Sequence, residues 1–242
     1  ALGLHEADGA GEAADAFTRR GAAEVSAAIT DAGGLCVSAT PERPADDATL
    51  NTQPLVHIEQ IGSAPRRPLP GPTPMAPLVG IRVLDLTRVI AGPIATRTLA
   101  LLGADVLRID PPALPEIPLQ HLDTGHGKRS ALLDLRAAAH RTRFDALLET
   151  ADVVVLGYRP QGLRSLGINP HTLAARRPGL VIAQLSAWGD PDRRGFDSLV
   201  QAASGIAWVE SLDGTAPGVL PAQALDHSAG YLLASAVMTL LE

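Results

Sequence analysis

The feature that most limits the possible folds is an alternation of apolar, strand-length runs with longer helical stretches after residue 77. The strand-like runs read IRVLDL, ADVLRID, ADVVVLGY and GLVIAQLSAW, and helical stretches such as GPIATRTLALLG, RAAAHRTRFDALLET and PHTLAARRP lie between them. Strands that are apolar throughout are buried on both faces, which is typical of a parallel sheet covered by helices. The sequence therefore predicts an α/β fold, an open Rossmann-like parallel sheet with helices on both faces.

A proline-rich stretch, APRRPLPGPTPMAP, divides the chain. Each proline removes a backbone donor and disfavours helix in the residue before it, so residues 64–77 are expected to form an extended linker. The predicted parts are therefore residues 1–63, the linker 64–77 and residues 78–242. Before the linker we expect one or two helices, a short strand in GGLCVSAT and another strand at 55–61.

Composition excludes several classes of protein. Twenty basic and 26 acidic residues are spread along the chain, so we expect no nucleic-acid partner. The single cysteine, Cys36, rules out an internal disulfide, and nothing in the pattern asks for a metal. No apolar run approaches the ~18 to 20 residues of a membrane span, and the first residues lack a signal-peptide pattern, so a cytoplasmic protein without a membrane contact is expected. The missing initial Met and the unfinished apolar C-terminal pattern suggest a fragment.

Common enzyme motifs are missing or incomplete. The glycine-rich fingerprint of dinucleotide enzymes does not appear in TRVIAGPIATR, the loop after the first predicted strand. GHGKRS fails as a P-loop because Leu122 stands in place of the first glycine and Arg129 in place of Ser or Thr. No G-x-S-x-G elbow is present, and the histidine spacing does not match a helical zinc motif. Nicotinamide, flavin and common hydrolase chemistry are disfavoured.

An acid and an imidazole, Asp226 and His227, stand side by side in the otherwise apolar segment LPAQALDHSAGYLLAS. A carboxylate before an apolar helix commonly caps that helix by accepting hydrogen bonds from its first N–H groups. The local sequence alone favours this capping interpretation, and the rest of the chain has to decide.

Six motifs in series carry a resemblance to a known family. They read PLVGIRVLDLTRVIAGPIATRTLALLGADVLRID, GKRSALLDL, ADVVVLGYRP, RPGLVIAQLSAWG, RRGFDSLVQAASG and QALDHSAGYLLA. In this order they resemble the N-terminal large domain of the family III CoA-transferases, a family that includes formyl-CoA and carnitine CoA-transferases and α-methylacyl-CoA racemase. The resemblance implies a truncated CoA-binding large domain over 78–242. Residues 1–63 resemble part of the family's C-terminal region, which suggests a tandem or fused member.

The resemblance implies a function and a nucleophile. It implies an acyl-CoA:carboxylate CoA-transferase in which Asp226 forms a covalent aspartyl-CoA thioester. The implied substrates are an acyl-CoA and a small carboxylic acid, so coenzyme A is a substrate rather than a permanently bound cofactor, and the full-length protein is expected to be a homodimer. His227 either orients the acid or the substrate, or is a structural imidazole.

The resemblance also implies a set of CoA contacts. Residues along the nucleotide would be Arg88, Val89, Ile90 and Ala91, and residues near its phosphates would be Arg108 and Lys128. Tyr158 would provide an aromatic surface for the base, and Arg159 a guanidinium for a phosphate. The sequence departs from the family at Gly157, where an asparagine is usual. Arg108 and Arg159 are equally consistent with ordinary surface ion pairs. The neighbouring Lys128 and Arg129 are also consistent with an ordinary solvated surface.

Two alternatives stay open. An acyl-CoA racemase needs a histidine in the motif that here reads RRGFDSLV, and Phe196 in its place cannot move a proton. A non-catalytic CoA-binding subunit is the other alternative, since the order of the segments is unusual for the family and Gly157 stands in place of the usual asparagine. Trp188 and Trp208 are expected to line part of the acyl pocket.

Overall fold

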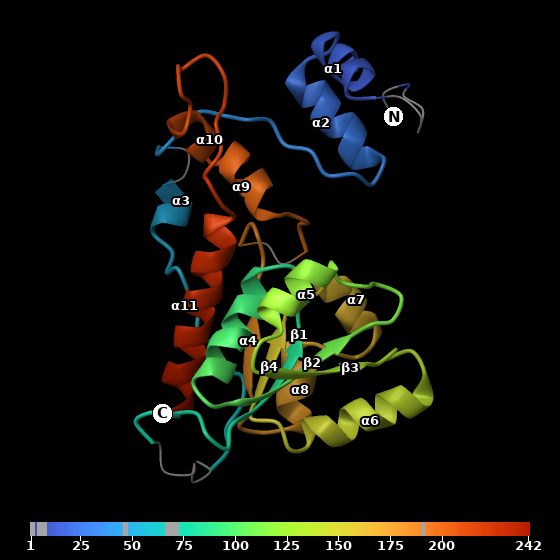
Figure 1. The fold of residues 1–242 in the computed structure, drawn as a ribbon, viewed down its shortest axis with the longest axis vertical. Helices are drawn as coiled ribbons and strands as arrows, with labels where there is room; N and C mark the ends of the chain where they lie inside the picture. Colours follow the sequence, from blue (N-terminus) through green and yellow to red (C-terminus); the bar gives the residue numbers. More distant parts are fainter. Residues whose placement is uncertain (1–2, 4–8, 46–47, 66–72, 190–191) are drawn as a thin grey trace. The chain divides into compact units, whose positions relative to one another are not determined.

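The computed structural model of the protein describes residues 3, 9–45, 48–65, 73–189 and 192–242 (Figure 1). The chain divides into two compact units. The helical unit comprises Ala1–Gln53, Ala187–Gly189 and Arg193–Ala224, and the sheet unit comprises Pro54–Ser186, Asp190–Asp192 and Leu225–Glu242. The division into residues 1–63, 64–77 and 78–242 stays a prediction, and positions 66–72 of the predicted linker lie outside the described residues.

Five parallel strands form the sheet in the order β3-β2-β1-β4-β5. They are β1 (Arg82–Leu86), β2 (Asp105–Asp110), β3 (Lys128–Leu132), β4 (Val153–Leu156) and β5 (Val181–Gln184). From β1, the chain adds β2 and β3 toward one edge of the sheet and then β4 and β5 toward the other edge, so the direction of strand addition reverses between β1 and β4. Ligands of open α/β sheets bind at the carboxyl ends of the strands beside such a reversal. The predicted parallel α/β fold is confirmed.

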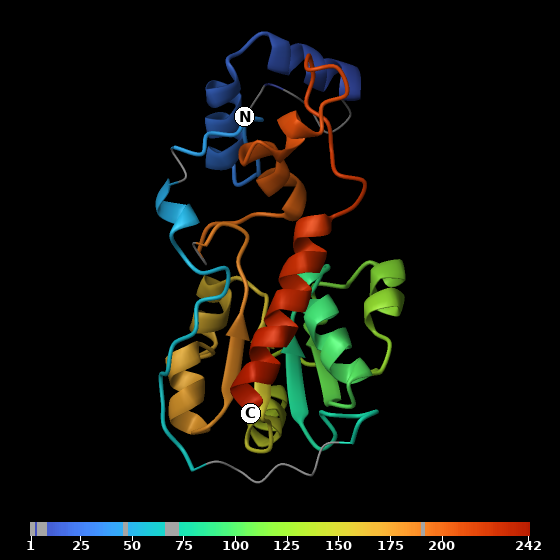
Figure 2. The same cartoon turned by 90° about the vertical axis from the view of Figure 1, so that its left-hand side faces the viewer.

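Helices cover both faces of the sheet, because β1 and β4 direct alternate side chains to opposite sides. Val83 and Val153 pack on one face against α4 (Ala91–Leu101) and α11 (Ala224–Leu241), which lie beside each other in Figure 2. On the other face, Leu84 and Val154 pack against helices that follow β3 and β4. Those helices are α6 (Ala138–Leu148), α7 (Pro160–Ser165) and α8 (Pro170–Arg176), and α5 (Pro118–Thr124) follows β2.

The helical unit contains short helices and irregular segments. Its helices are α1 (Ala10–Thr18), α2 (Ala22–Asp31), α3 (Ala48–Asn51), α9 (Asp197–Ala203) and α10 (Ile206–Val209). The two strands expected before the linker, in GGLCVSAT and at 55–61, are wrong, because both segments are irregular. Leu55 is 89% exposed and Ile58 53%. Apolar residues alone do not form a strand where no neighbouring strand supplies hydrogen-bond partners.

One helix in the described part of the chain, α11, is long and apolar enough to cross a membrane by length and composition. It spans 18 residues with a mean hydropathy of 1.2, so the expectation that no apolar run approaches this length is wrong. A single such helix is weak evidence for a membrane span. Ala234 and Val237 of α11 pack against the sheet, and 17% of the helix is buried.

Candidate active site at the carboxyl edge of the sheet

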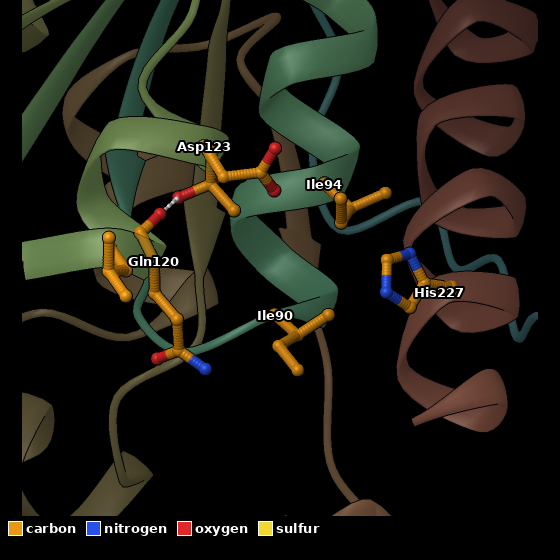
Figure 3. Close-up of a pocket in the computed structure, with 7 residues that line it drawn as sticks. Ile90, Ile94, Gln120, Asp123 and His227 are labelled. Carbon is orange, nitrogen blue, oxygen red and sulfur yellow. Dashed lines mark hydrogen bonds between the residues drawn. The ribbon is translucent and has the colours of Figure 1, made fainter. Parts of the chain in front are cut away.

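A pocket of about 240 Å³ lies in the sheet unit, where α4, α5 and α11 meet (Figure 3). It is lined by Ile90, Ile94, Leu119, Gln120, Asp123, Thr124 and His227. Ile90 belongs to the loop between β1 and α4, so the pocket lies at the carboxyl end of the central strand. His227 approaches from α11, and Gln120 and Asp123 belong to α5 on the other side. The pocket therefore combines an apolar wall with an imidazole, a carboxamide, a hydroxyl and a carboxylate.

Asp226 lies in the first turn of α11, at its third residue. The carboxylate is therefore inside the helix and not at the cap position that the capping interpretation requires. Consecutive residues of a helix are rotated by about 100°, so Asp226 lies on the face of α11 next to the one that presents His227 to the pocket. Asp226 is partly exposed. A carboxylate in the first turn is stabilised by the positive end of the helix dipole.

Asp85 anchors a fully buried polar network beneath the first turn of α4. One carboxylate oxygen accepts hydrogen bonds from the backbone N–H and the hydroxyl of Thr87, at 3.1 and 2.5 Å. The other accepts from the Thr96 hydroxyl at 2.6 Å and from the Lys128 ammonium at 3.0 Å. Lys128 also donates to the carbonyl of Pro93 at 2.9 Å. The network therefore connects β1, the edge strand β3 and the start of α4.

Lys128, a predicted phosphate contact, is part of this buried network. Its side chain is 1% exposed, and the ammonium group faces Asp85. Burial lowers the pKa of Lys128 below its ordinary value, although the negative charge of Asp85 partly opposes the shift. The contact between Lys128 and CoA stays a prediction, and in this structure the group holds protein segments together. Its neighbour Arg129 is 71% exposed and pairs with Asp105 at 2.6 Å.

Arg108, the other predicted phosphate contact, is also buried, with a side chain 1% exposed. Its guanidinium donates to Asp110 at 3.0 Å and to Glu116 at 3.0 Å. Burial by itself would lower the pKa of Arg108, but the charges of Asp110, Asp85 and Glu116 outweigh burial and raise it. Arg108 therefore stays charged and joins the end of β2 to the segment before α5.

Val89, one of the predicted nucleotide contacts, has an unusual backbone. Its φ angle is +70°, in the left-handed region that a β-branched side chain disfavours by about 1–3 kcal/mol. The N–H of Val89 donates to Glu116 at 2.9 Å. Sequence reasoning missed Glu116, which lies in the irregular segment DPPALPEIP and matches no motif. Arg88 lies near the same carboxylate, at 3.6 Å.

Burial would raise the pKa of Glu116, but the hydrogen bonds from the amides of Val89 and Ile117 and the charges of Arg88 and Arg108 outweigh it. The net effect lowers the pKa of this carboxyl below its ordinary value. Glu116 is therefore ionised at neutral pH and acts as an acceptor for the loop.

Tyr158 and Arg159 follow β4 on the other side of the sheet reversal. Burial raises the pKa of the Tyr158 hydroxyl, which has no hydrogen-bond partner among the described residues. Arg159 is exposed and directly precedes α7.

Gly157, which replaces the usual asparagine, lies against Thr87, so a Cβ at position 157 would be 3.0 Å from the Thr87 Cβ. The close approach of these two loops explains why a small residue fits at 157.

Other candidate residues lie in the helical unit. Trp188 donates to the carbonyl of Arg194 at 2.9 Å and stacks under Arg193, at 3.8 Å from the ring centre. Trp208 also belongs to this unit, so neither tryptophan lines the pocket of the sheet unit. Phe196 is 50% exposed at the start of α9. Within the described ranges, no group of three or more His, Cys, Asp or Glu side chains could hold a metal ion.

Comparison with known proteins identifies similar chains. The model of CoA-transferase family III matches residues 78–242. A "Probable fatty acyl-CoA transferase" of Mycobacterium tuberculosis is 33% identical over 190 residues, which cover 72% of this chain and 48% of the relative. The succinate–glutarate CoA-transferase of Agrobacterium fabrum is 32% identical over 157 residues, which cover 56% of this chain and 39% of the relative.

The crystal structure of a hypothetical protein from M. tuberculosis superposes with a TM-score of 0.63 at 34% identity, over 69% of this chain and 51% of the other. The chain thus spans about half the length of the proteins that it matches.

Proposed function

Because the chain belongs to CoA-transferase family III, we propose that it transfers coenzyme A from an acyl-CoA to a carboxylic acid, with Asp226 as the nucleophile. The observation that carries this proposal is the position of Asp226 in the first turn of α11, next to the residue that lines the pocket. The carboxylate is partly exposed and lies at the N-terminal end of a helix. Both properties suit an ionised group that has to reach a thioester.

The proposed reaction proceeds through two carboxylate attacks. The Asp226 carboxylate attacks the thioester carbonyl, CoA leaves as a thiolate, and an acyl-aspartyl anhydride forms. The thiolate then attacks the aspartyl carbonyl, which releases the donor acid and leaves an aspartyl-CoA thioester. The acceptor carboxylate repeats these steps in reverse. Backbone N–H groups in the first turn of α11 are suitable donors to the oxyanion, and one such donor is commonly worth about 3 kcal/mol in the transition state.

The pocket favours a small substrate acid. Its volume of about 240 Å³ is below the range of roughly 300–1,000 Å³ that is typical for drug-sized ligands. His227, Gln120 and Thr124 provide polar groups in the wall, and the carboxylate of Asp123 is paired with Arg97 at 3.0 Å. This arrangement suits a short acid with a second polar group. A relative named for succinate and glutarate supports the same class of acceptor. The homodimer and the cytoplasmic location stay predictions.

Trapping with hydroxylamine tests the proposal. In the presence of an acyl-CoA, hydroxylamine should inactivate the protein and convert Asp226 to a hydroxamate, which mass spectrometry detects on the peptide that contains α11. Asp226→Asn should fold normally, lose CoA exchange and carry no modification. Full exchange activity in this variant would disprove the nucleophile. A racemase would instead exchange deuterium at C2 of the acyl group without moving CoA, and a non-catalytic subunit would bind CoA without either reaction.

A further inference from the structure

A carboxylate from a distant segment holds the strained turn at Val89. The φ angle of +70° at this residue is disfavoured by its branched side chain. The N–H of Val89 donates to Oε2 of Glu116 at 2.9 Å, across 27 residues of sequence. Strained backbone persists only where surrounding groups fix it, and it is frequent at functional sites. Glu116 is the side chain that accepts the hydrogen bond from this turn.

Glu116 is in turn fixed from the side of the sheet. Its Oε2 also accepts from Arg108 at 3.0 Å, and its Oε1 accepts from the amide of Ile117 at 3.1 Å. Arg108 is buried and bound to Asp110 at the end of β2. The side chain of Glu116 is 6% exposed. The carboxylate is therefore a bridge from the end of β2 to the loop that follows β1.

Arg88 is held more loosely than Arg108. Its guanidinium lies 3.6 Å from Oε1 of Glu116 and 3.4 Å from the carbonyl of Pro115, and its side chain is 29% exposed. Arg108 is the closer positive partner of Glu116, at 3.0 Å. Arg88 can therefore turn toward an anion without leaving a buried carboxylate unpaired.

We propose that Glu116 is a positioning residue for coenzyme A. By fixing the left-handed turn at Val89, it keeps residues 88–91 in the shape that accepts the nucleotide and leaves Arg88 able to contact a phosphate. Glu116 acts through Val89 and does not touch the ligand. A loop that is ordered before binding costs less conformational entropy on binding. This inference rests on the proposed function, since it takes the loop to be the CoA site.

Three variants and one control separate this role from a general structural one. Glu116→Ala removes the acceptor and the charge, whereas Glu116→Gln keeps the side-chain shape and one acceptor oxygen. The double variant Val89→Gly/Glu116→Ala lacks the Glu116 carboxylate but has a glycine at position 89, which adopts the positive φ of the turn without strain. The matched control is Glu149→Gln, because Glu149 is exposed at the end of α6.

The kinetic result should be a change in KM rather than in kcat. In Glu116→Ala we expect the KM for acyl-CoA to rise about tenfold and kcat to change less than about threefold, with a smaller rise in Glu116→Gln. Adding Val89→Gly should recover part of the KM, and Glu149→Gln should behave like the wild type. An unchanged KM in folded Glu116→Ala and Glu116→Gln proteins would overturn the proposal. If the alanine variant fails to fold, the glutamine variant decides.

Hydrogen exchange in the ligand-free protein gives a second measurement that needs no activity. The amides of residues 88–91 should exchange about tenfold faster in Glu116→Ala than in the wild type, with a smaller increase in Glu116→Gln and the amides of β4 unchanged. Equal exchange in the wild type and both variants would show that Glu116 does not hold the turn. A wild type that neither binds nor transfers CoA would contradict the proposed function, and the exchange data would still decide the role of Glu116.

Discussion

Gly230 of α11 lies directly against Ala91 in the first turn of α4. A Cβ at position 230 would be 2.6 Å from the carbonyl oxygen of Ala91 and 2.8 Å from Cγ2 of Ile94. The glycine therefore sets how closely the start of α11 approaches the loop after β1. Asp226 and His227 lie one turn before this contact, so their positions depend on it.

Gly230→Ala should destabilise the protein and reduce activity. Alanine is a better helix former than glycine by about 1 kcal/mol, but backbone atoms of α4 cannot yield cheaply to the added methyl group, so we expect a net loss of about 1–3 kcal/mol. Urea denaturation measures the free energy of unfolding. Gly162→Ala in α7 is the control, because a Cβ there meets nothing within 4 Å. Equal stability of the two variants would contradict the tight contact.

Lys128→Met should be strongly destabilising. It leaves the buried Asp85 carboxylate without its cation, and such a loss costs about 3–5 kcal/mol. The adjacent Arg129→Gln is the control, because its exposed pair with Asp105 is worth at most about 1 kcal/mol. Thermal or urea unfolding of both variants checks the difference. A small effect of Lys128→Met would mean that the ammonium group is not committed to Asp85 and is available to a ligand.

The stability contributed by Glu116 should disappear in acid. Its pKa is lower in the folded protein than the ordinary glutamate value of 4.5, so the carboxylate stabilises the fold above that pH. This contribution is lost as the pH falls through the lowered pKa and the carboxylate is protonated. The difference in unfolding free energy between wild type and Glu116→Gln should therefore be constant near neutral pH and shrink below about pH 4.5. A difference that stays constant down to pH 3 would contradict the ionised assignment.

His227→Leu should raise the KM for the acceptor acid and leave stability nearly unchanged. The side chain lines the pocket and is partly exposed, so the loss removes a polar contact with little packing. His227→Gln should retain part of the affinity because it can still donate a hydrogen bond. Steady-state kinetics with short dicarboxylic acids provides the measurement, and Ser228→Ala is the exposed control. A loss of stability without a change in KM would identify a structural imidazole.

Four of the five strands could be predicted because their burial shows in their residues. β4, for example, is buried at every position and reads VVVL. The edge strand β3 reads KRSAL and carries exposed polar residues, so its sequence has no apolar run to reveal it. β3 is recognised only through its pairing with its neighbour β2.

Local pattern determined the parallel α/β fold, because strand periodicity and helix starts are properties of neighbouring residues, whereas Asp226 was chosen through the resemblance of six motifs to a known family. The tertiary structure decided where charges are neutralised. Nothing in the sequence indicates that Lys128 faces Asp85, or that Glu116 meets Val89. Each pair joins separate segments, and burial and ion pairing depend on which segments folding brings together.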